Sequence, residues 1–253
     1  FNELSRNSPA PGGGSVSALV GALGASLSSM VACLTHEKKG NIDLKPEMDQ
    51  IGMDAQNFLR RLLFLIDEDT HAFNSVITSN RLPSENKDEK KHKIKEVESS
   101  NKYAAEVPLE TAKLCLQVIL LSNKLIKLGN PNSVTDASVA IEVAAAGVRG
   151  ACLNVMINLK EIKDNSFKLE KSKEVAKILN EVDRINNAGG SLKNNAKGVS
   201  ESDIKEAIKL GVCKINIATD LRLLWTRIFR EFFRDSSGEW DHLKPGKKYM
   251  EEL

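Results

Sequence analysis

The strongest constraint on the fold is an uncharged stretch at residues 8–35, SPAPGGGSVSALVGALGASLSSMVACLT. Small residues recur every four positions within it, and residues four apart lie on the same face of a helix. Apolar side chains fill the positions between them, which predicts a helix buried on nearly every side. A membrane span requires about twenty predominantly apolar residues, whereas the segment from Gly14 to Thr35 contains five serines and three glycines. We therefore expect a core helix in which backbones approach closely.

The following region carries only helical patterns. We expect helices over residues 46–79, 85–128, 136–160 and 167–186, with the second of these broken or kinked at Pro108 because proline removes a backbone donor. No segment here shows the alternation of a strand. The sequence thus predicts an all-α, bundle-like domain over residues 1–186.

The pattern changes after this domain. Residues 187–198 belong to a polar, glycine-bearing stretch, NNAGGSLKNNAKG, which is typical of a linker. Beyond it, residues 199–253 read as a helix, a short buried strand (KINIAT) and an amphipathic helix (LRLLWTRIFREFF). We expect a separate, short α/β tail.

Composition narrows the class of protein. The 36 basic and 34 acidic residues leave a net charge of +2, which argues against a nucleic-acid partner. Four cysteines occur singly, without a C-x-x-C pair, so neither a structural zinc site nor a disulfide framework is expected. This usage suits a reducing compartment, and we expect a cytoplasmic protein. Because the chain opens at Phe1, close to its richest motif, we expect that a preceding segment is missing.

Two groups near the start of the chain are candidates for chemistry. Gly12, Gly13 and Gly14 precede the buried helix, where exposed backbone N–H groups attract anions and glycine lets a ligand come close. A plain turn explains the same pattern equally well. Lys38 and Lys39 follow the helix, and their simplest role is to complement its dipole.

Two further groups lie on later helices. Asp67, Glu68, Asp69 and His71 are crowded together, but neighbouring helix residues point in different directions, so at most two can face one site. A solvated acidic face is the simpler interpretation. Asn154 and Asn158 lie four apart among apolar and small residues, and buried amides need partners. Either loop backbone or a bound heterocycle would satisfy them.

The uncharged motif, the KKG that follows it and the helix carrying DEDTHAF together resemble the formiminotetrahydrofolate cyclodeaminase family, which includes a methenyltetrahydrofolate cyclohydrolase branch. Further matches are VPLETA and KLGNPNSVTDASVAIEVAAAGVRGACLNVMINLKEIKD. The resemblance covers residues 1 to about 186. It implies an all-α domain that pairs into a homodimer, binds folate in a cleft and serves histidine degradation, with no membrane or nucleic-acid partner.

The resemblance also implies a reaction. N10 of 5-formiminotetrahydrofolate attacks the formimino carbon, and ammonia leaves to give 5,10-methenyltetrahydrofolate. The family's proton donor matches Asp69. The ligand-facing turn would comprise Gly12, Gly13, Gly14 and Ser15; Lys38 and Lys39 would meet the glutamate carboxylates; and Asp136, Asn154 and Asn158 would read the pterin edge. No metal and no cofactor beyond the tetrahydrofolate substrate is implied.

The tail resembles the end of class II (ketose-bisphosphate) aldolases. Gly189, Gly190, Ser191, Asn216, Thr219 and Asp220 match phosphate-holding residues in type, but Ala188 stands where a metal-binding histidine is expected. Only the last unit or two of an eight-unit barrel is present, so aldolase activity is not expected. The alternatives to a cyclodeaminase are a cyclohydrolase, a catalytically silent folate-binding helical module and, least favoured, an aldolase-related protein.

Overall fold

The computed structural model describes residues 3–38 and 42–188, together with Ile228. Five helices make up the described fold: α1 (Gly13–His36), α2 (Lys45–Asn80), α3 (Lys87–Leu128), α4 (Val134–Asn158) and α5 (Asn165–Ala188). Three single-turn 3₁₀ helices, Ile42–Leu44, Pro131–Ser133 and Leu159–Glu161, connect them. The described residues contain no strand, so the all-α expectation is confirmed for this part of the chain.

The chain divides into two compact units, Phe1–Asn186 and Asn187–Leu253. The predicted linker at 187–198 lies outside the described residues apart from its first two, which continue α5. The predicted α/β tail at 199–253 lies outside them apart from Ile228. The candidate site lies in the first unit.

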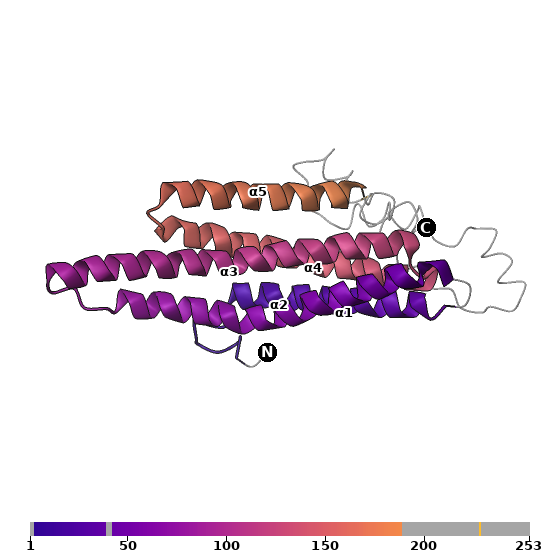
Figure 1. Cartoon of the computed structure of the whole chain (residues 1–253), viewed down its shortest axis with the longest axis horizontal. Coiled ribbons are helices and arrows are strands. Elements are labelled where there is room, and N and C mark those ends of the chain that lie inside the picture. Colours follow the sequence, from indigo (N-terminus) through magenta and orange to yellow (C-terminus); the bar gives the residue numbers. More distant parts are fainter. Residues whose placement is uncertain (1–2, 39–41, 189–227, 229–253) are drawn as a thin grey trace, which may run out of the picture. The chain divides into compact units, whose positions relative to one another are not determined.

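Helices α1 to α4 run alternately up and down, and Figure 1 shows them side by side. Small residues of α1 set the close approach between them. A side chain at Gly24 would lie 2.9 Å from the Ala140 carbonyl of α4, and one at Gly147 of α4 would lie 2.9 Å from the Ser17 carbonyl. The expected close packing of the uncharged helix is confirmed.

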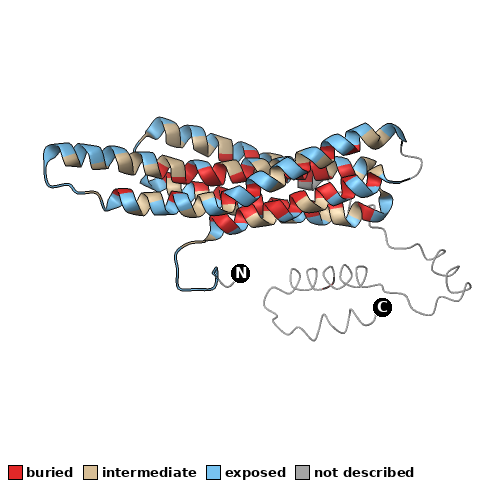
Figure 2. Ribbon diagram, turned by 60° about the horizontal axis from the view of Figure 1, so that its bottom comes forward, coloured by how far each residue is buried: buried red, intermediate tan, exposed pale blue. Residues whose placement is uncertain are grey.

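The core lies between these four helices, and Figure 2 shows its buried residues concentrated along the middle of the bundle. By length and composition, α1 and the segment Pro131–Glu161 could each cross a membrane. About half of each is buried inside the bundle instead, at 56% and 50% of the respective windows. This burial is what the core helix of a globular domain shows.

The expected break at Pro108 does not occur, because α3 continues from Lys87 to Leu128 with Pro108 inside it. Proline has no N–H to donate to the carbonyl four residues earlier, which here belongs to Ala104. The side-chain amide of Asn158 donates to that carbonyl instead, at 2.6 Å. A side chain from α4 thus replaces the missing bond of α3, and the local rule fails for a tertiary reason.

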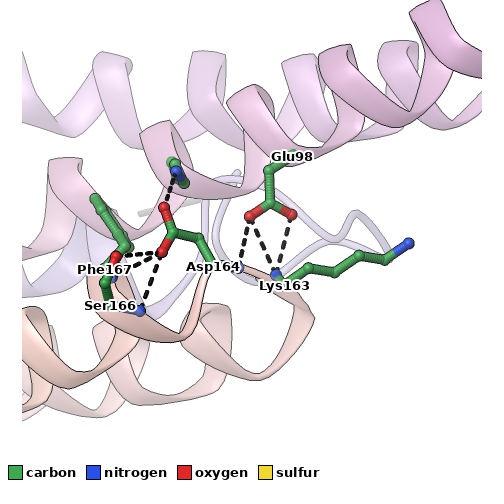
Figure 3. Close-up of polar contacts among 6 residues, drawn as sticks. Glu98, Lys163, Asp164, Ser166 and Phe167 are labelled. Atoms are coloured by element: carbon green, nitrogen blue, oxygen red, sulfur yellow. Dashed lines mark hydrogen bonds and ion pairs between the residues drawn. The ribbon is translucent and has the colours of Figure 1, made fainter.

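The turn into α5 is fixed by two carboxylates, as Figure 3 shows. Glu98 accepts from the backbone N–H groups of Lys163 and Asp164, at 3.0–3.1 Å. Asp164 accepts from the N–H groups of Ser166 and Phe167 and so caps the helix. The Lys102 ammonium also donates to Asp164, at 2.7 Å. These contacts hold α5 against α3.

We expect Asp164→Ala to lower the melting temperature by roughly 2–4 °C at pH 7, as the loss of a helix cap does. The hydrogen bond from Lys102 holds the pKa of Asp164 well below its usual range, with further help from Ser166. A carboxyl whose pKa is lowered by folding stabilises the fold at pH values above its pKa in the unfolded chain, about 4. This stabilisation is lost as pH falls through its pKa in the folded chain. The difference between wild type and variant should therefore shrink below about pH 4. Thermal unfolding followed by circular dichroism tests this, with the exposed Asp183→Ala as control; a constant difference down to pH 2 would contradict it.

Candidate active site

A cavity of about 270 Å³ lies where the start of α1 meets α2, α3 and the end of α4. It is lined by Pro9, Ala10, Gly12, Gly13, Gly14, Asp69, Ala72, Phe73, Val76, Asn101, Ala104, Asn154, Asn158 and Glu161. The structure thus brings together six of the predicted site residues: the three glycines, Asp69 and both asparagines. Its charged lining residues are both acidic, Asp69 and Glu161.

Asp69 is the one member of the acidic cluster that lines this cavity. Asp67 and His71 are exposed, and Glu68 accepts a hydrogen bond from Tyr103. The expectation that at most two of these four residues could face one site is therefore met. Burial raises the pKa of Asp69 above its usual value, although hydrogen bonds from Ser15 partly oppose the shift. Asp69 therefore holds its proton to a higher pH than an exposed carboxyl does.

Ser15 fixes the Asp69 carboxyl in place. Its backbone N–H donates to Oδ2 at 2.8 Å, and its hydroxyl donates to the same oxygen at 3.0 Å. The hydroxyl also lies 3.0 Å from the Ile66 carbonyl, so its single proton has two competing acceptors. When the proton goes to Ile66, the Ser15 oxygen is able to accept one from a protonated Asp69. Ser15, predicted as part of the ligand-facing turn, is instead buried and acts on Asp69.

The position of the Asp69 carboxyl leaves no room for a side chain at Gly14. A Cβ built at Gly14 would overlap the Asp69 carboxylate, lying 2.5 Å from its carbon. A Cβ at Gly13 would make only ordinary contact with the Asn154 amide, at 3.4 Å, and one at Gly12 would lie 3.5 Å from the Pro9 carbonyl. The glycine run therefore serves chiefly to let Asp69 reach the first turn of α1, and Gly14 is the residue that does this.

Three asparagines give the cavity a surface of hydrogen-bond acceptors. The Nδ2 groups of Asn101, Asn154 and Asn158 donate to the backbone carbonyls of Glu161, Gly150 and Ala104 at 3.3, 2.8 and 2.6 Å. No described residue donates to their Oδ1 atoms. These oxygens, with Asp69 and Glu161, are available to a ligand rich in N–H donors.

Asn158 has a structural role that can be separated from ligand binding. We expect Asn158→Leu to destabilise the fold by about 1–3 kcal/mol, because the Ala104 carbonyl loses its donor. In the Pro108→Ala background a backbone N–H is restored four residues after Ala104, so the same substitution should cost clearly less. Urea unfolding of the two single variants and the double variant measures this coupling. Equal costs in both backgrounds would show that Asn158 does not compensate for Pro108.

Two predicted site residues lie far from the cavity. Lys38 follows the end of α1 that is opposite the cavity. A helix of 24 residues is about 35 Å long, so Lys38 is about that far from the glycine turn. Its ammonium donates to Asn130 at 3.5 Å. Asp136 is in the first turn of α4, whereas Asn154 and Asn158 are near that helix's end. Within one chain, neither Lys38 nor Asp136 reaches the ligand space. Lys39 lies outside the described residues.

Several lining residues were missed by the sequence interpretation. Asn101 is buried on α3, and Glu161 lies in the 3₁₀ turn after α4. Asn101 occurs in the polar run ESSNKY, where nothing distinguishes it from its neighbours. Phe73, by contrast, follows Asp69 by four residues, so helical spacing alone would have placed it on the same face.

Comparison with known proteins identifies the fold and its relatives. A family model described as "Formiminotransferase-cyclodeaminase" matches residues 1–177, and one described as "Fructose-bisphosphate aldolase class-II" matches residues 189–253. The crystal structure of formiminotetrahydrofolate cyclodeaminase from Thermotoga maritima aligns with a TM-score of 0.66 and 30% identity, covering 73% of this chain and 88% of that one.

Two curated relatives carry different names. Methenyltetrahydrofolate cyclohydrolase of Methylorubrum extorquens is 36% identical over 183 residues, 72% of this chain and 88% of that protein. Formimidoyltransferase-cyclodeaminase of Rattus norvegicus is 32% identical over 179 residues, 71% of this chain but only 33% of that protein. Both are enzymes by name. The chain therefore belongs to the formiminotransferase-cyclodeaminase family.

Proposed function

We propose that this chain converts 5-formiminotetrahydrofolate to 5,10-methenyltetrahydrofolate with release of ammonia, using Asp69 as the proton donor. The observation that carries the proposal is the Asp69 carboxyl, held by Ser15 in the cavity with a raised pKa. The choice of substrate rests on the family and on the names of the aligned relatives.

The proposed step forms one bond and breaks another. N10 attacks the formimino carbon, and the N10 proton passes to the formimino nitrogen, so that the carbon becomes tetrahedral and bears an amino group. A proton from Asp69 then makes that group a neutral leaving group, and ammonia departs as the methenyl bridge forms. No oxidation state changes, so the step needs no redox cofactor. The cavity's contributions are orientation of N10 toward the carbon and delivery of the proton.

The acceptor oxygens of the cavity support a folate. The pterin ring carries an amino group and a ring N–H, and the formimino group carries a further N–H. The carbonyl oxygens of Asn101, Asn154 and Asn158 are available to groups of this kind. Phe73, Val76 and Ala72 supply apolar surface for the flat ring system.

A cyclohydrolase is the second candidate, favoured by the 36% identity to the Methylorubrum extorquens enzyme and by the 88% coverage of that protein. In that reaction water adds to the methenyl carbon and the C–N5 bond opens. Asp69 would then act in its ionised form, accepting a proton from the water. The two reactions therefore require opposite protonation states of the same carboxyl.

One assay separates the candidates. The purified chain is given 5-formiminotetrahydrofolate, and the rise of methenyl absorbance is followed together with ammonia release. In parallel it is given 5,10-methenyltetrahydrofolate, and the loss of that absorbance is followed against the uncatalysed rate. Equal ammonia and methenyl production supports the cyclodeaminase. Enzyme-dependent loss of the methenyl absorbance alone supports the cyclohydrolase. The absence of both activities would overturn both candidates and leave a silent folate-binding module.

We also propose that the working form is a homodimer. The support is a solvent-exposed apolar face on α1 and α4, where Leu23 is 52% exposed and Leu153 is 72% exposed. Large apolar side chains exposed on two neighbouring helices are typical of an interaction surface.

A further inference from the structure

The first turn of α1 takes its cap from another helix. Its N-cap residue is Gly12, which has no side chain to accept from the free N–H groups of the turn. Asp69 of α2 takes this place, because its Oδ2 accepts from the Ser15 N–H at 2.8 Å, as an N-cap side chain accepts from the third residue of a helix. A backbone N–H can only donate, so Oδ2 has to remain an acceptor.

This bond bears on which oxygen of Asp69 holds the proton. In a protonated carboxyl the carbonyl oxygen is a good acceptor and the hydroxyl oxygen a poor one, so the Ser15 N–H favours the proton on Oδ1. A proton on Oδ2 could reach the Ser15 hydroxyl, but the N–H would then face the poorer acceptor. Oδ1 accepts no hydrogen bond from the described residues, and it is the atom of Asp69 nearest to the place of a Cβ on Gly14, which also lines the cavity.

The Ser15 hydroxyl differs from other hydroxyls of its helix. Three serines of α1 donate to the carbonyl four residues earlier in the same helix: Ser17, Ser26 and Ser28. Ser15 is only the third residue of α1, so the carbonyl four residues earlier lies before the helix begins. Its hydroxyl crosses to α2 instead, where it lies 3.0 Å from Asp69 Oδ2 and 3.0 Å from the Ile66 carbonyl. Because Ser15 is only 3% exposed, water competes little for this proton.

We propose that the Ser15 hydroxyl turns from the Ile66 carbonyl to Asp69 Oδ2 as the transferable proton leaves Oδ1, so that two donors meet the new carboxylate. Both acceptors already lie at 3.0 Å, so only the hydroxyl hydrogen has to rotate. Ile66 lies inside α2, and its carbonyl keeps the helical hydrogen bond when the hydroxyl turns away. The carboxylate gains a charge-assisted bond, which is stronger than the neutral bond it replaces. Ser15 is thus a positioning residue that acts through Asp69.

The effect on turnover rests on the proposed function, whereas the hydrogen bonds themselves do not. In the proposed reaction the proton passes from Oδ1 to the amino group on the tetrahedral carbon, ammonia leaves, and Asp69 stays a carboxylate until solvent returns a proton. Burial disfavours this carboxylate and raises the pKa of Asp69, and the hydrogen bonds from the Ser15 hydroxyl and N–H oppose that shift. A donor that turns to the carboxylate only as its charge forms stabilises the transition state more than the ground state.

Other charged groups near Asp69 come from three elements, and α1 contributes none from Gly13 to Thr35. They are Asp67, Glu68 and His71 on α2, Tyr103 on α3, whose hydroxyl donates to Glu68, and Glu161 in the turn after α4. A substitution at Ser15 leaves each of these groups unchanged. A change in the titration of Asp69 therefore reports the loss of the hydroxyl.

The hydrogen bond is tested without activity, by carbon NMR of protein labelled at the aspartate carboxyls. The Asp69 signal is the one lost in Asp69→Asn. Ser15→Ala removes the hydroxyl and keeps the N–H, so the midpoint of the Asp69 titration should move to higher pH, because the charged form loses a donor. Ser15→Cys, whose thiol is a weak donor, should move it in the same direction by less. Ser17→Ala, at a buried serine whose hydroxyl stays within α1, is the matched control and should not move it. An unchanged or lowered midpoint in Ser15→Ala, or an equal rise in Ser17→Ala, would overturn the proposal.

Turnover gives the second readout. At pH values where Asp69 is protonated in both proteins, Ser15→Ala should lower kcat by about 10-fold to 100-fold with KM largely kept, because a hydrogen bond to a charged group is lost only as the charge forms. The fall of kcat at higher pH should shift together with the NMR midpoint. A lower kcat whose pH profile does not shift would show that Ser15 only supports the fold, and would overturn the proposal. Absence of turnover in wild type would instead overturn the proposed function, and the NMR titration would still decide the role of the Ser15 hydroxyl.

Discussion

Replacing Asp69 by Asn is expected to reduce kcat by about 100-fold to 10,000-fold, the range that a positioned general acid contributes. The amide keeps the size of the carboxyl and still accepts the hydrogen bonds from Ser15. It has no proton acidic enough to give to departing ammonia. Substrate affinity, measured by equilibrium titration, should change little. Turnover within a fewfold of wild type would remove Asp69 from the role of acid.

The same variant has a second signature in its stability. Burial raises the pKa of Asp69 in the folded state, so ionisation of its carboxyl opposes folding. The contribution of this carboxyl to stability is complete at low pH and is lost as pH rises through its pKa in the folded state. Asp69→Asn should therefore gain stability relative to wild type at pH 7, and this gain should disappear in acid. For the cyclodeaminase, wild-type kcat should also fall as pH rises through this pKa, because the acid must be protonated. A rise with pH would favour the cyclohydrolase. Asp67→Asn, at an exposed neighbouring position, is the matched control for both measurements.

Much of the fold follows from helical spacing in the sequence. The small residues of α1 predict its burial, because only close packing explains so many of them without charge. Pro108 marks the limit of such local rules. The expected break depends on a lost hydrogen bond, and a side chain 50 residues further along the chain, Asn158, makes that bond instead. Sequence spacing shows that a donor is missing, but not which distant group replaces it.

Residue spacing alone predicted only part of the candidate site. Spacing limits how many of the acidic residues on α2 can face one place, but only the family motif singles out Asp69. Asn154 and Asn158 stand out because they are polar on an otherwise apolar helix. Asn101 has polar neighbours and gives no such contrast. Lys38 and Asp136 were assigned to the same site, but in this chain they lie at the other end of the bundle. The order of motifs does not show which helix ends meet.

Gly14→Ala is expected to lower kcat/KM about 100-fold, the cost of moving a catalytic group by about 1 Å. The added methyl group would overlap the Asp69 carboxylate, which is the end of a flexible side chain and is therefore the part that moves. The carboxyl must therefore swing away, which breaks the hydrogen bond from the Ser15 N–H. Steady-state kinetics measures the effect, and the pH profile should lose the inflection that belongs to Asp69.

The matched control is Gly52→Ala, another helical glycine, where the new methyl group would lie 3.8 Å from the Ala32 side chain. Both substitutions replace glycine by a better helix former, which favours folding by up to about 1 kcal/mol. Gly52→Ala should thus keep full activity and gain stability. If Gly14→Ala behaved in the same way, the glycine run would be an ordinary helix start. If its turnover fell while its pH profile kept the Asp69 inflection, the loss would come from blocked substrate approach, as a branched side chain at Gly13 would also cause, and not from displacement of the acid.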